Sequence, residues 1–270
     1  MDPKLKLWIG IGAFTLVQAT GIPLEKAGQG LFATPAYAAE GGEGGEGGEG
    51  GEGGEAGIDV EAAAKDPVEY LVALDVIAAH YLAGRDAYAA GNHEAGTEMF
   101  AHGIAEVYVD LEPVLKARGV KPFQAEMERT VALAGEKADA AKVRAQVDRV
   151  MAALRAAAAK APRNGLPRES VEAGVITELL DRAARQYAAA AESKELEPYL
   201  DGYGFTRAAI ARSGKLKGFA QKHPADAGSI RAAFDRVKAA YPTATRPDPL
   251  PAQPGELLAL TAKAKIAARH

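Results

Sequence analysis

Cysteine is absent from the 270-residue chain. Its absence excludes disulfide bonds, cysteine-ligated zinc, iron–sulfur clusters and covalently attached c-type haem. It also excludes thiol catalysis and a bacterial lipoprotein anchor, so we expect no lipid anchor.

Aromatic residues are scarce, at 6% of the chain, and the single tryptophan is Trp8. The apolar content is mostly alanine, the residue with the strongest helix propensity. No stretch of alternating β-branched residues is long enough to indicate a strand. The sequence therefore predicts an all-α fold, an up-and-down helical bundle with one or two sub-bundles.

The motifs of common enzyme classes are missing as well. The chain has no Gly-rich phosphate loop, no His-Glu-x-x-His and no Gly-x-Ser-x-Gly, and serine is scarce. Lys215 and Lys217 form only a small basic group, which is far from a nucleic-acid-binding surface. We expect neither an enzyme nor a nucleic-acid partner.

The N-terminus has the pattern of a secretory signal peptide. Lys4 and Lys6 precede an apolar run over 7–17, and Ala36-Tyr-Ala38 supplies a small-residue cleavage site. We expect residues 1–38 to be removed on export to the periplasm. The alternative is an uncleaved membrane anchor over residues 7–24, which is just long enough to span a bilayer.

A Gly-Gly-Glu repeat with a period of three follows this segment. Glycine loses much backbone entropy on ordering and the six glutamates repel one another, so residues 39–57 are predicted to form a disordered tether. A solubilising spacer is the expected role, and a weak binder of divalent cations is the alternative.

The rest of the chain divides by charge and by linkers. Residues 58–118 hold 11 acidic and 4 basic residues, whereas residues 119–270 hold 17 acidic and 25 basic ones. A Pro/Gly-containing linker over 161–167 separates a predicted helical hairpin and bundle, 58–161, from a predicted C-terminal helical module, 162–270. The expected helices cover roughly residues 67–90, 93–118, 122–134, 137–161, 168–193, 197–212, 226–240 and 255–269.

Three helices carry features from which we predict irregularities. Pro113 is expected to bend or split the second helix of the hairpin. Gly202 and Gly204 are expected to disturb the helix that starts near residue 197. Asp226 is expected to cap the helix that follows His223-Pro224. The first long helix of the chain is predicted to have one apolar face, formed by Tyr70, Leu74, Ile77, Tyr81, Gly84 and Tyr88.

Three of the five histidines, His80, His93 and His102, lie in the acidic hairpin. Two antiparallel helices that turn at Gly91 place His80 and His102 at the same level. Glu98 and Glu106 each lie four residues from His102 on one face of its helix. Imidazole and carboxylate ligands suit iron, copper, zinc or manganese.

The sequence thus predicts a metal site at His80, His102 and Glu106, with Glu98 or Asp75 as a fourth ligand. Met99 is a further soft ligand if the ion is copper. The alternative is that the histidines only flank a packed helix seam.

Two stretches of the C-terminal part resemble a known family. They are residues 178–187 with 197–207, Glu-Leu-Leu-Asp-Arg-Ala-Ala-Arg-Gln-Tyr and Glu-Pro-Tyr-Leu-Asp-Gly-Tyr-Gly-Phe-Thr-Arg, and the ending from Phe234 through a Pro-rich loop to a last helix. Over residues 168–268 they resemble the helical extracytoplasmic module found with bacterial high-affinity iron permeases. The resemblance implies an iron-related role in the envelope.

Arg168-Glu169-Ser-Val-Glu172 also fits the Arg-Glu-x-x-Glu pattern that carries iron in such permeases. Acidic residues are common in the first turn of a helix, where they complement its dipole, and we favour that interpretation. Together these features predict an exported, periplasmic metal-binding protein in iron or copper acquisition. The alternative is a non-catalytic scaffold that meets a membrane protein or another envelope-complex partner.

Overall fold

A computed structural model describes residues 57–269 of the chain. The predicted signal peptide and all but the last residue of the predicted tether lie outside the described residues. The described part is all-α, as predicted, and contains no strand. Its helices are α2 (Val60–Ala63), α3 (Pro67–Ala89), α4 (His93–His102), η1 (Gly103–Tyr108), α5 (Val109–Ala117), α6 (Gln124–Gly135), α7 (Ala140–Ala158), α8 (Arg168–Glu192), α9 (Glu197–Arg212), η2 (Ser213–Lys215), α10 (Leu216–Lys222), α11 (Pro224–Ala240) and α12 (Pro254–Ala267).

Helix α3 begins where the sequence predicted it. The Asp66 carboxylate accepts hydrogen bonds from the backbone N–H groups of Val68 (2.7 Å) and Glu69 (3.2 Å), and Pro67 occupies the first helical position. These bonds satisfy amides that have no partner inside the helix. Asn92 caps α4 in the same way through the N–H of Ala95, so α3 and α4 form the predicted hairpin.

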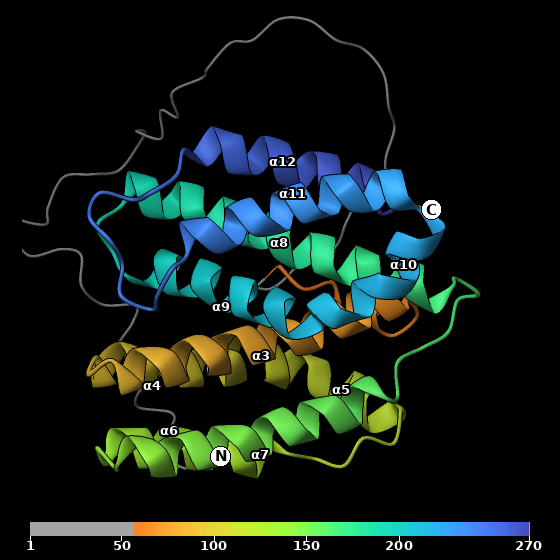
Figure 1. Cartoon of the computed structure of the whole chain (residues 1–270). Coiled ribbons are helices and arrows are strands. Elements are labelled where there is room, and N and C mark those ends of the chain that lie inside the picture. The colour runs from red at the N-terminus through yellow and green to blue at the C-terminus, as the bar shows by residue number, and fades with distance from the viewer. Residues whose placement is uncertain (1–56, 270) are drawn as a thin grey trace, which may run out of the picture. The chain divides into compact units, whose positions relative to one another are not determined.

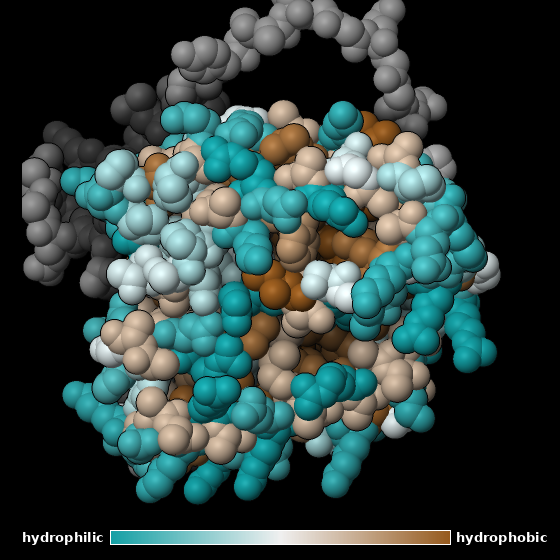
Figure 2. All heavy atoms as spheres, viewed as in Figure 1, coloured by the Kyte–Doolittle hydropathy of each residue, from teal (hydrophilic) through white to brown (hydrophobic). Residues whose placement is uncertain are grey.

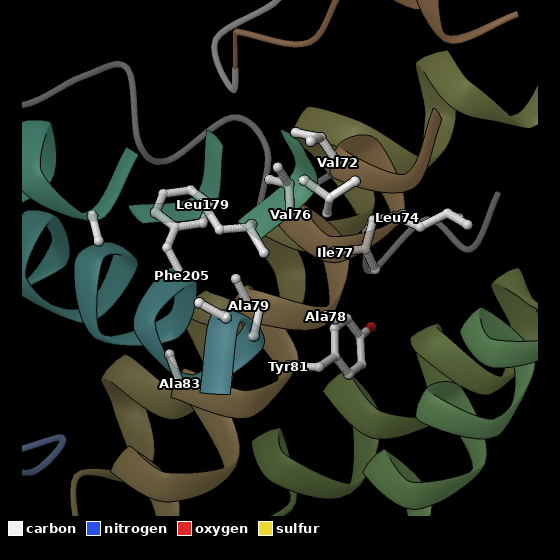
Figure 3. Close-up of a cluster of buried hydrophobic side chains, with 14 of the residues drawn as sticks. Val72, Leu74, Val76, Ile77, Ala78, Ala79, Tyr81, Ala83, Leu179 and Phe205 are labelled. Atoms are coloured by element: carbon white, nitrogen blue, oxygen red, sulfur yellow. The ribbon is translucent and has the colours of Figure 1, made fainter. Parts of the chain in front are cut away.

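Helix α3 lies at the centre of the described bundle, between α8 and α9 on one side and α4, α6 and α7 on the other (Figure 1). The sequence predicted one apolar face, but nearly every residue of α3 is buried. Figure 3 shows Leu179 and Phe205 on one side of this helix and Tyr81 pointing away from them. A helix that is covered on all sides needs small or apolar residues around its whole circumference, and the alanines of α3 supply them.

Helices from both sides of the 159–167 loop therefore share one core. Helix α3 packs against α7, which precedes this loop, and against α8 and α9, which follow it. The residues from 57 to 269 belong to one compact unit. The predicted segments 58–161 and 162–270 meet along α3, and this arrangement brings side chains of the acidic hairpin next to those of α9.

The second helix of the hairpin is irregular, but the irregularity lies several residues before Pro113, where the sequence predicted it. Residues Gly103–Tyr108 form a π-helical turn, and the N–H of Val109 bonds to the carbonyl of Ile104, five residues earlier. Pro113 lies inside α5. A proline ring crowds the carbonyl of the residue four positions before it, here Val109, so its effect falls on the preceding turn.

Helix α9 is continuous, and the predicted disturbance at Gly202 and Gly204 is wrong. A Cβ atom on Gly204 would lie 2.5 Å from the carbonyl oxygen of Ala79, and one on Gly202 would lie 1.8 Å from the Tyr241 hydroxyl. These glycines therefore permit close packing of α9 against its neighbours. Because α9 approaches α3 so closely, its polar side chains can reach those of α3.

The C-terminal helices follow the predicted order. Helix α11 begins at Pro224 with His223 as the preceding residue, so Asp226 lies in the first turn and is not the N-cap. Proline at the first helical position needs no N–H partner, which explains the earlier start. The proline-rich loop after α11 is tied to the bundle by Tyr199, whose hydroxyl donates to the carbonyl of Thr243 (2.8 Å).

None of the helices in the described part is long and apolar enough to cross a membrane. Figure 2 shows that the face seen in this view is mainly hydrophilic, with hydrophobic residues exposed near its centre. Helices α10 and α11 also enclose an apolar groove, lined by Leu216, Ala220, Ala227, Ile230 and Phe234 among others.

Candidate metal-binding site

His80 is the most deeply buried side chain of the candidate site, with 4% of its surface exposed. Its Nδ1 lies 2.9 Å from the carbonyl oxygen of Val76. A carbonyl only accepts hydrogen bonds, so Nδ1 carries the proton and Nε2 keeps its lone pair. Burial lowers the pKa of His80, which keeps the ring neutral. A backbone carbonyl that orients a histidine in this way is typical of metal-ligating histidines.

His102 and Glu106 face His80 from the neighbouring helix. The two imidazole rings meet edge to face, with their centroids 6.3 Å apart. Glu106 lies between them, because its Oε1 is 3.5 Å from His102 Nδ1 and its Oε2 is 3.7 Å from His80 Nε2. His102 ends α4 and Glu106 lies in the π-helical turn, so the hairpin register predicted from the sequence brings these three side chains together.

Helix α9 adds two carboxylates that the sequence analysis did not assign to the site. Glu197 Oε1 lies 3.3 Å from His102 Nδ1, and Asp201 Oδ1 lies 3.6 Å from His80 Nε2. The two residues are four positions apart, so they share one face of the helix. We refer to His80, His102, Glu106, Glu197 and Asp201 as the histidine cluster.

The charge of Asp201 is poorly compensated. Its Oδ1 is buried and accepts no hydrogen bond. Burial, and then the negative charges of Glu197 and Glu106, raise the pKa of Asp201 to about 7. The salt bridges of the histidine cluster, as far as the structure describes the chain, join its members only to one another and include no lysine or arginine.

The distances in the cluster are longer than hydrogen bonds but match ligands around an ion. N–H···O hydrogen bonds are about 2.7–3.2 Å long. Two ligand atoms that each lie about 2.1 Å from a metal ion, at a tetrahedral angle, are about 3.4 Å apart. The four nitrogen–oxygen distances of the cluster are 3.3, 3.5, 3.6 and 3.7 Å. His102, Glu106 and Glu197 each have one ligand atom within 4.8 Å of the others, whereas the predicted ligand His80 and Asp201 do not belong to this group.

The remaining predicted ligands lie elsewhere. Glu98 is exposed and is not part of the group formed by His102, Glu106 and Glu197. The Asp75 carboxylate is bound by Arg212, whose Nη2 donates to Oδ1 at 3.1 Å. Met99 is buried in the hydrophobic core. Asp75 is therefore occupied by a cationic side chain, and Glu98 is replaced in the cluster by Glu197 of α9.

The Arg-Glu-x-x-Glu segment at the start of α8 is held by cationic side chains. Glu172 accepts hydrogen bonds from Arg212 Nη1 (2.7 Å) and Lys215 Nζ (3.0 Å), and Glu169 pairs with Lys222. Since both carboxylates bind cationic side chains of the same chain, their geometry favours a structural role over an iron site.

A cavity of about 250 Å³ adjoins the inner part of the histidine cluster. His80, Glu106 and Asp201 line one part of it, and α8 contributes Asp181 and Arg182. A water molecule occupies about 30 Å³ in the liquid, so the cavity has room for several. Solvent or a small ligand can therefore reach the cluster from this side.

Sequence reasoning missed Glu197 and Asp201 because nothing local connects them to the hairpin. They follow His80 by more than a hundred residues, and their approach depends on the packing of α9 against α3 at Gly204 and Ala79. The available signal was the spacing of two acidic residues on one helix face, together with the small residues that permit a close helix contact.

The chain matches no protein-family model, no curated protein and no solved structure.

Proposed function

We propose that this protein binds a divalent transition-metal ion, with His102, Glu106 and Glu197 as ligands and His80 beside them. The observation that carries the proposal is the convergence of these side chains from three helices at distances that fit a shared ion. Imidazole and carboxylate donors suit zinc, iron, copper or manganese.

Electrostatics support the same ligand class. The negative charges of Glu106 and Glu197 act on Asp201 and raise its pKa. No lysine or arginine forms a salt bridge with any of these three carboxylates in the described residues. A buried carboxylate without a partner is costly, and a bound cation removes that cost. Metal binding is therefore expected to stabilise the folded protein as well as to occupy the site.

Two sequence features support a cellular location and a role for this metal binding. The signal-peptide pattern over 1–38 favours export to the periplasm, and the resemblance of residues 168–268 to the iron-permease module favours a role in iron or copper acquisition. In this role the protein would hold the ion for a membrane-protein or envelope-complex partner.

Calorimetric titration of the untagged, exported protein with Fe²⁺, Zn²⁺, Cu²⁺ and Mn²⁺ tests the proposal. We expect His102→Ala and Glu197→Gln each to lower the affinity for the preferred ion at least tenfold, because each removes a ligand. Circular dichroism checks that both variants remain folded, as expected for side chains that are 29% and 56% exposed.

Glu195→Gln and Glu98→Gln are the matched controls. Both residues are exposed acids, one near Glu197 and the other one turn before His102. The affinities of both variants are expected to stay within about twofold of the wild type, because neither substitution removes a ligand atom and both side chains are exposed to solvent. Absence of binding by any of the four ions would contradict the proposal and favour the scaffold function.

A further inference from the structure

The groove between α10 and α11 has an apolar floor. The five apolar residues that line it are buried or half-buried: Leu216, Ala220, Ala227, Ile230 and Phe234. Its volume is about 480 Å³, and it shares no lining residue with the cavity beside the histidine cluster. Small-molecule sites have volumes of about 300–1,000 Å³ and mainly hydrophobic walls. The groove therefore suits a small, largely apolar ligand, and it is separate from the candidate metal site.

The rim of this groove is polar and carries a net positive charge. All five polar residues that line the groove are exposed: Ser213, Lys217, Gln221, Arg231 and Asp235. Lys217 belongs to α10 and Arg231 to α11, so each of the two helices supplies one cation. Asp235 is the one acid among these lining residues, which leaves the rim with one positive charge in excess.

The two rim cations differ from the other basic side chains of this segment. Lys215 Nζ lies 3.0 Å from Glu172 Oε1, and Lys222 pairs with Glu169, so carboxylates of α8 neutralise both lysines. Lys217 and Arg231, in contrast, form no salt bridge and no side-chain hydrogen bond with any of the residues that the structure describes. Two cations that no carboxylate of the chain contacts are therefore available to an anionic group at the rim.

We infer that the groove binds a fatty acid, with the acyl chain on the apolar floor and the carboxylate at the rim, between Lys217 and Arg231. A methylene group takes up about as much room as a water molecule, roughly 30 Å³, so the groove holds one chain of about a dozen carbons. Burial of the chain supplies the affinity, and the two cations select for a negatively charged head group.

Laurate and dodecyltrimethylammonium are the probes that test this site. Their saturated chains are of similar length, but their head groups have opposite charges. Both are titrated calorimetrically into the exported protein, below the critical micelle concentration and after removal of metal ions, so that laurate has no ion to bind at the histidine cluster. We expect one laurate per chain and an affinity for dodecyltrimethylammonium at least tenfold lower, because only laurate pairs with the rim cations.

Two variants separate the head-group contacts from the apolar floor. The double variant Lys217→Gln/Arg231→Gln is expected to lower the affinity for laurate at least tenfold without lowering that for dodecyltrimethylammonium. Ala220→Phe places a ring on the floor, and it is expected to lower the affinity for both ligands at least tenfold. Thermal unfolding verifies that the variants are folded, and the double variant alone decides if Ala220→Phe does not fold, because both of its side chains are exposed.

Lys238→Gln is the matched control. Lys238 is an exposed lysine in the last turn of α11, and it does not line the groove. Its loss changes the net charge of the chain by as much as either rim substitution does. The affinity for laurate is therefore expected to stay within about twofold of the wild type, and a larger decrease would mean that the net charge, and not the rim, selects the head group.

Three results would overturn the fatty-acid site. They are absence of laurate binding by the wild type, equal affinities for the two head groups, and unchanged laurate affinity in the double variant. Absence of binding would instead favour a helix of a partner protein as the occupant of the groove. None of these results affects the proposed metal site, which is tested by its own titration and shares no residue with the groove.

Discussion

Two groups of partly buried charged side chains gather around helices α3 and α9, and they balance their charges differently. The arginine cluster consists of Asp75, Glu172, Arg212 and Lys215, and the histidine cluster lies beside it. In the arginine cluster Arg212 and Lys215 donate to the carboxylates at 2.7–3.1 Å, the distances of charge-assisted hydrogen bonds. In the histidine cluster the corresponding distances are 3.3–3.7 Å and no cationic side chain takes part.

The two clusters differ in how the charges of their carboxylates are neutralised. Burial alone would lower the pKa of Arg212, but Asp75 and Glu172 raise it above its ordinary value, so this cluster is neutralised by the chain itself. The pKa of Asp201, in contrast, is raised to about 7 because burial and the charges of Glu197 and Glu106 outweigh the opposing effect of His102. The first group is complete as folded, and the second group has ligand atoms available for a cation from solution.

The largest effect is expected from breaking the arginine cluster. Arg212→Met leaves the Asp75 carboxylate without a partner and leaves Glu172 paired with Lys215 alone. Removing one member of a buried ion pair costs about 3–5 kcal/mol of the free energy of unfolding. Urea denaturation measures this loss. Arg207→Met is the control, because Arg207 is 38% exposed and pairs with Asp86 at 3.5 Å, so its loss is expected to cost about 1 kcal/mol or less.

A similar loss of stability in both arginine variants would contradict the larger contribution expected of the arginine cluster. Arg212→Met protein that is still folded is expected to bind as many metal ions per chain as the wild type. The reason is that Arg212 contacts no member of the histidine cluster in the described structure.

An intermediate effect is expected from pH in the metal-free protein. The carboxyl of Asp201 has a pKa of about 7 when folded and an ordinary value near 3.8 when unfolded. Between these values the unfolded chain has lost the proton and the folded chain keeps it, so the free energy of unfolding falls as the pH rises from about 4 to about 7. Asp201→Asn removes this contribution.

Urea denaturation at pH 5 and pH 7.5, in the presence of a chelator, measures the effect. The wild type is expected to lose about 1–3 kcal/mol more than Asp201→Asn over this interval, at about 1.4 kcal/mol for each pKa unit. Equal pH dependence of the two proteins would show that Asp201 does not titrate in this range.

The smallest effect is expected at the Arg-Glu-x-x-Glu segment. Glu169→Gln breaks an exposed ion pair with Lys222, which is solvated on the surface and contributes little. Isothermal titration with Fe²⁺ is expected to give the wild-type stoichiometry and affinity. Loss of an ion in this variant would move the iron site from the histidine cluster to the start of α8.

Local patterns in the sequence predicted much of the fold. Asp66-Pro67, Asn92 and the proline-rich loop before α12 each give a local signal, because capping and proline geometry depend on neighbouring residues. The hairpin register placed His80 level with His102 for the same reason. The turn at Gly91 is short, so the pairing of the two helices follows from counting residues.

The rest depended on packing between distant segments. No local pattern predicted that α9 lies beside α3, and therefore none predicted that Asp201 lies next to His80. Gly202 and Gly204 were interpreted as points where a helix bends, whereas in the structure their missing side chains let α9 approach Ala79 and Tyr241. Glycine has both roles in helices, and only the neighbouring segment decides between them.

The π-helical turn over Gly103–Tyr108 contains one residue more than a regular helical turn, and Glu106 of the candidate site lies inside it. Each residue of an α-helix turns the chain by about 100°. Deletion of the exposed Ala105 would let this turn close into a regular helix, and Glu106, which lies inside the turn, would shift relative to His102 and Glu197. Deletions are usually tolerated at exposed positions in surface loops, but here the loss of one exposed alanine would disturb the geometry of the three candidate ligands.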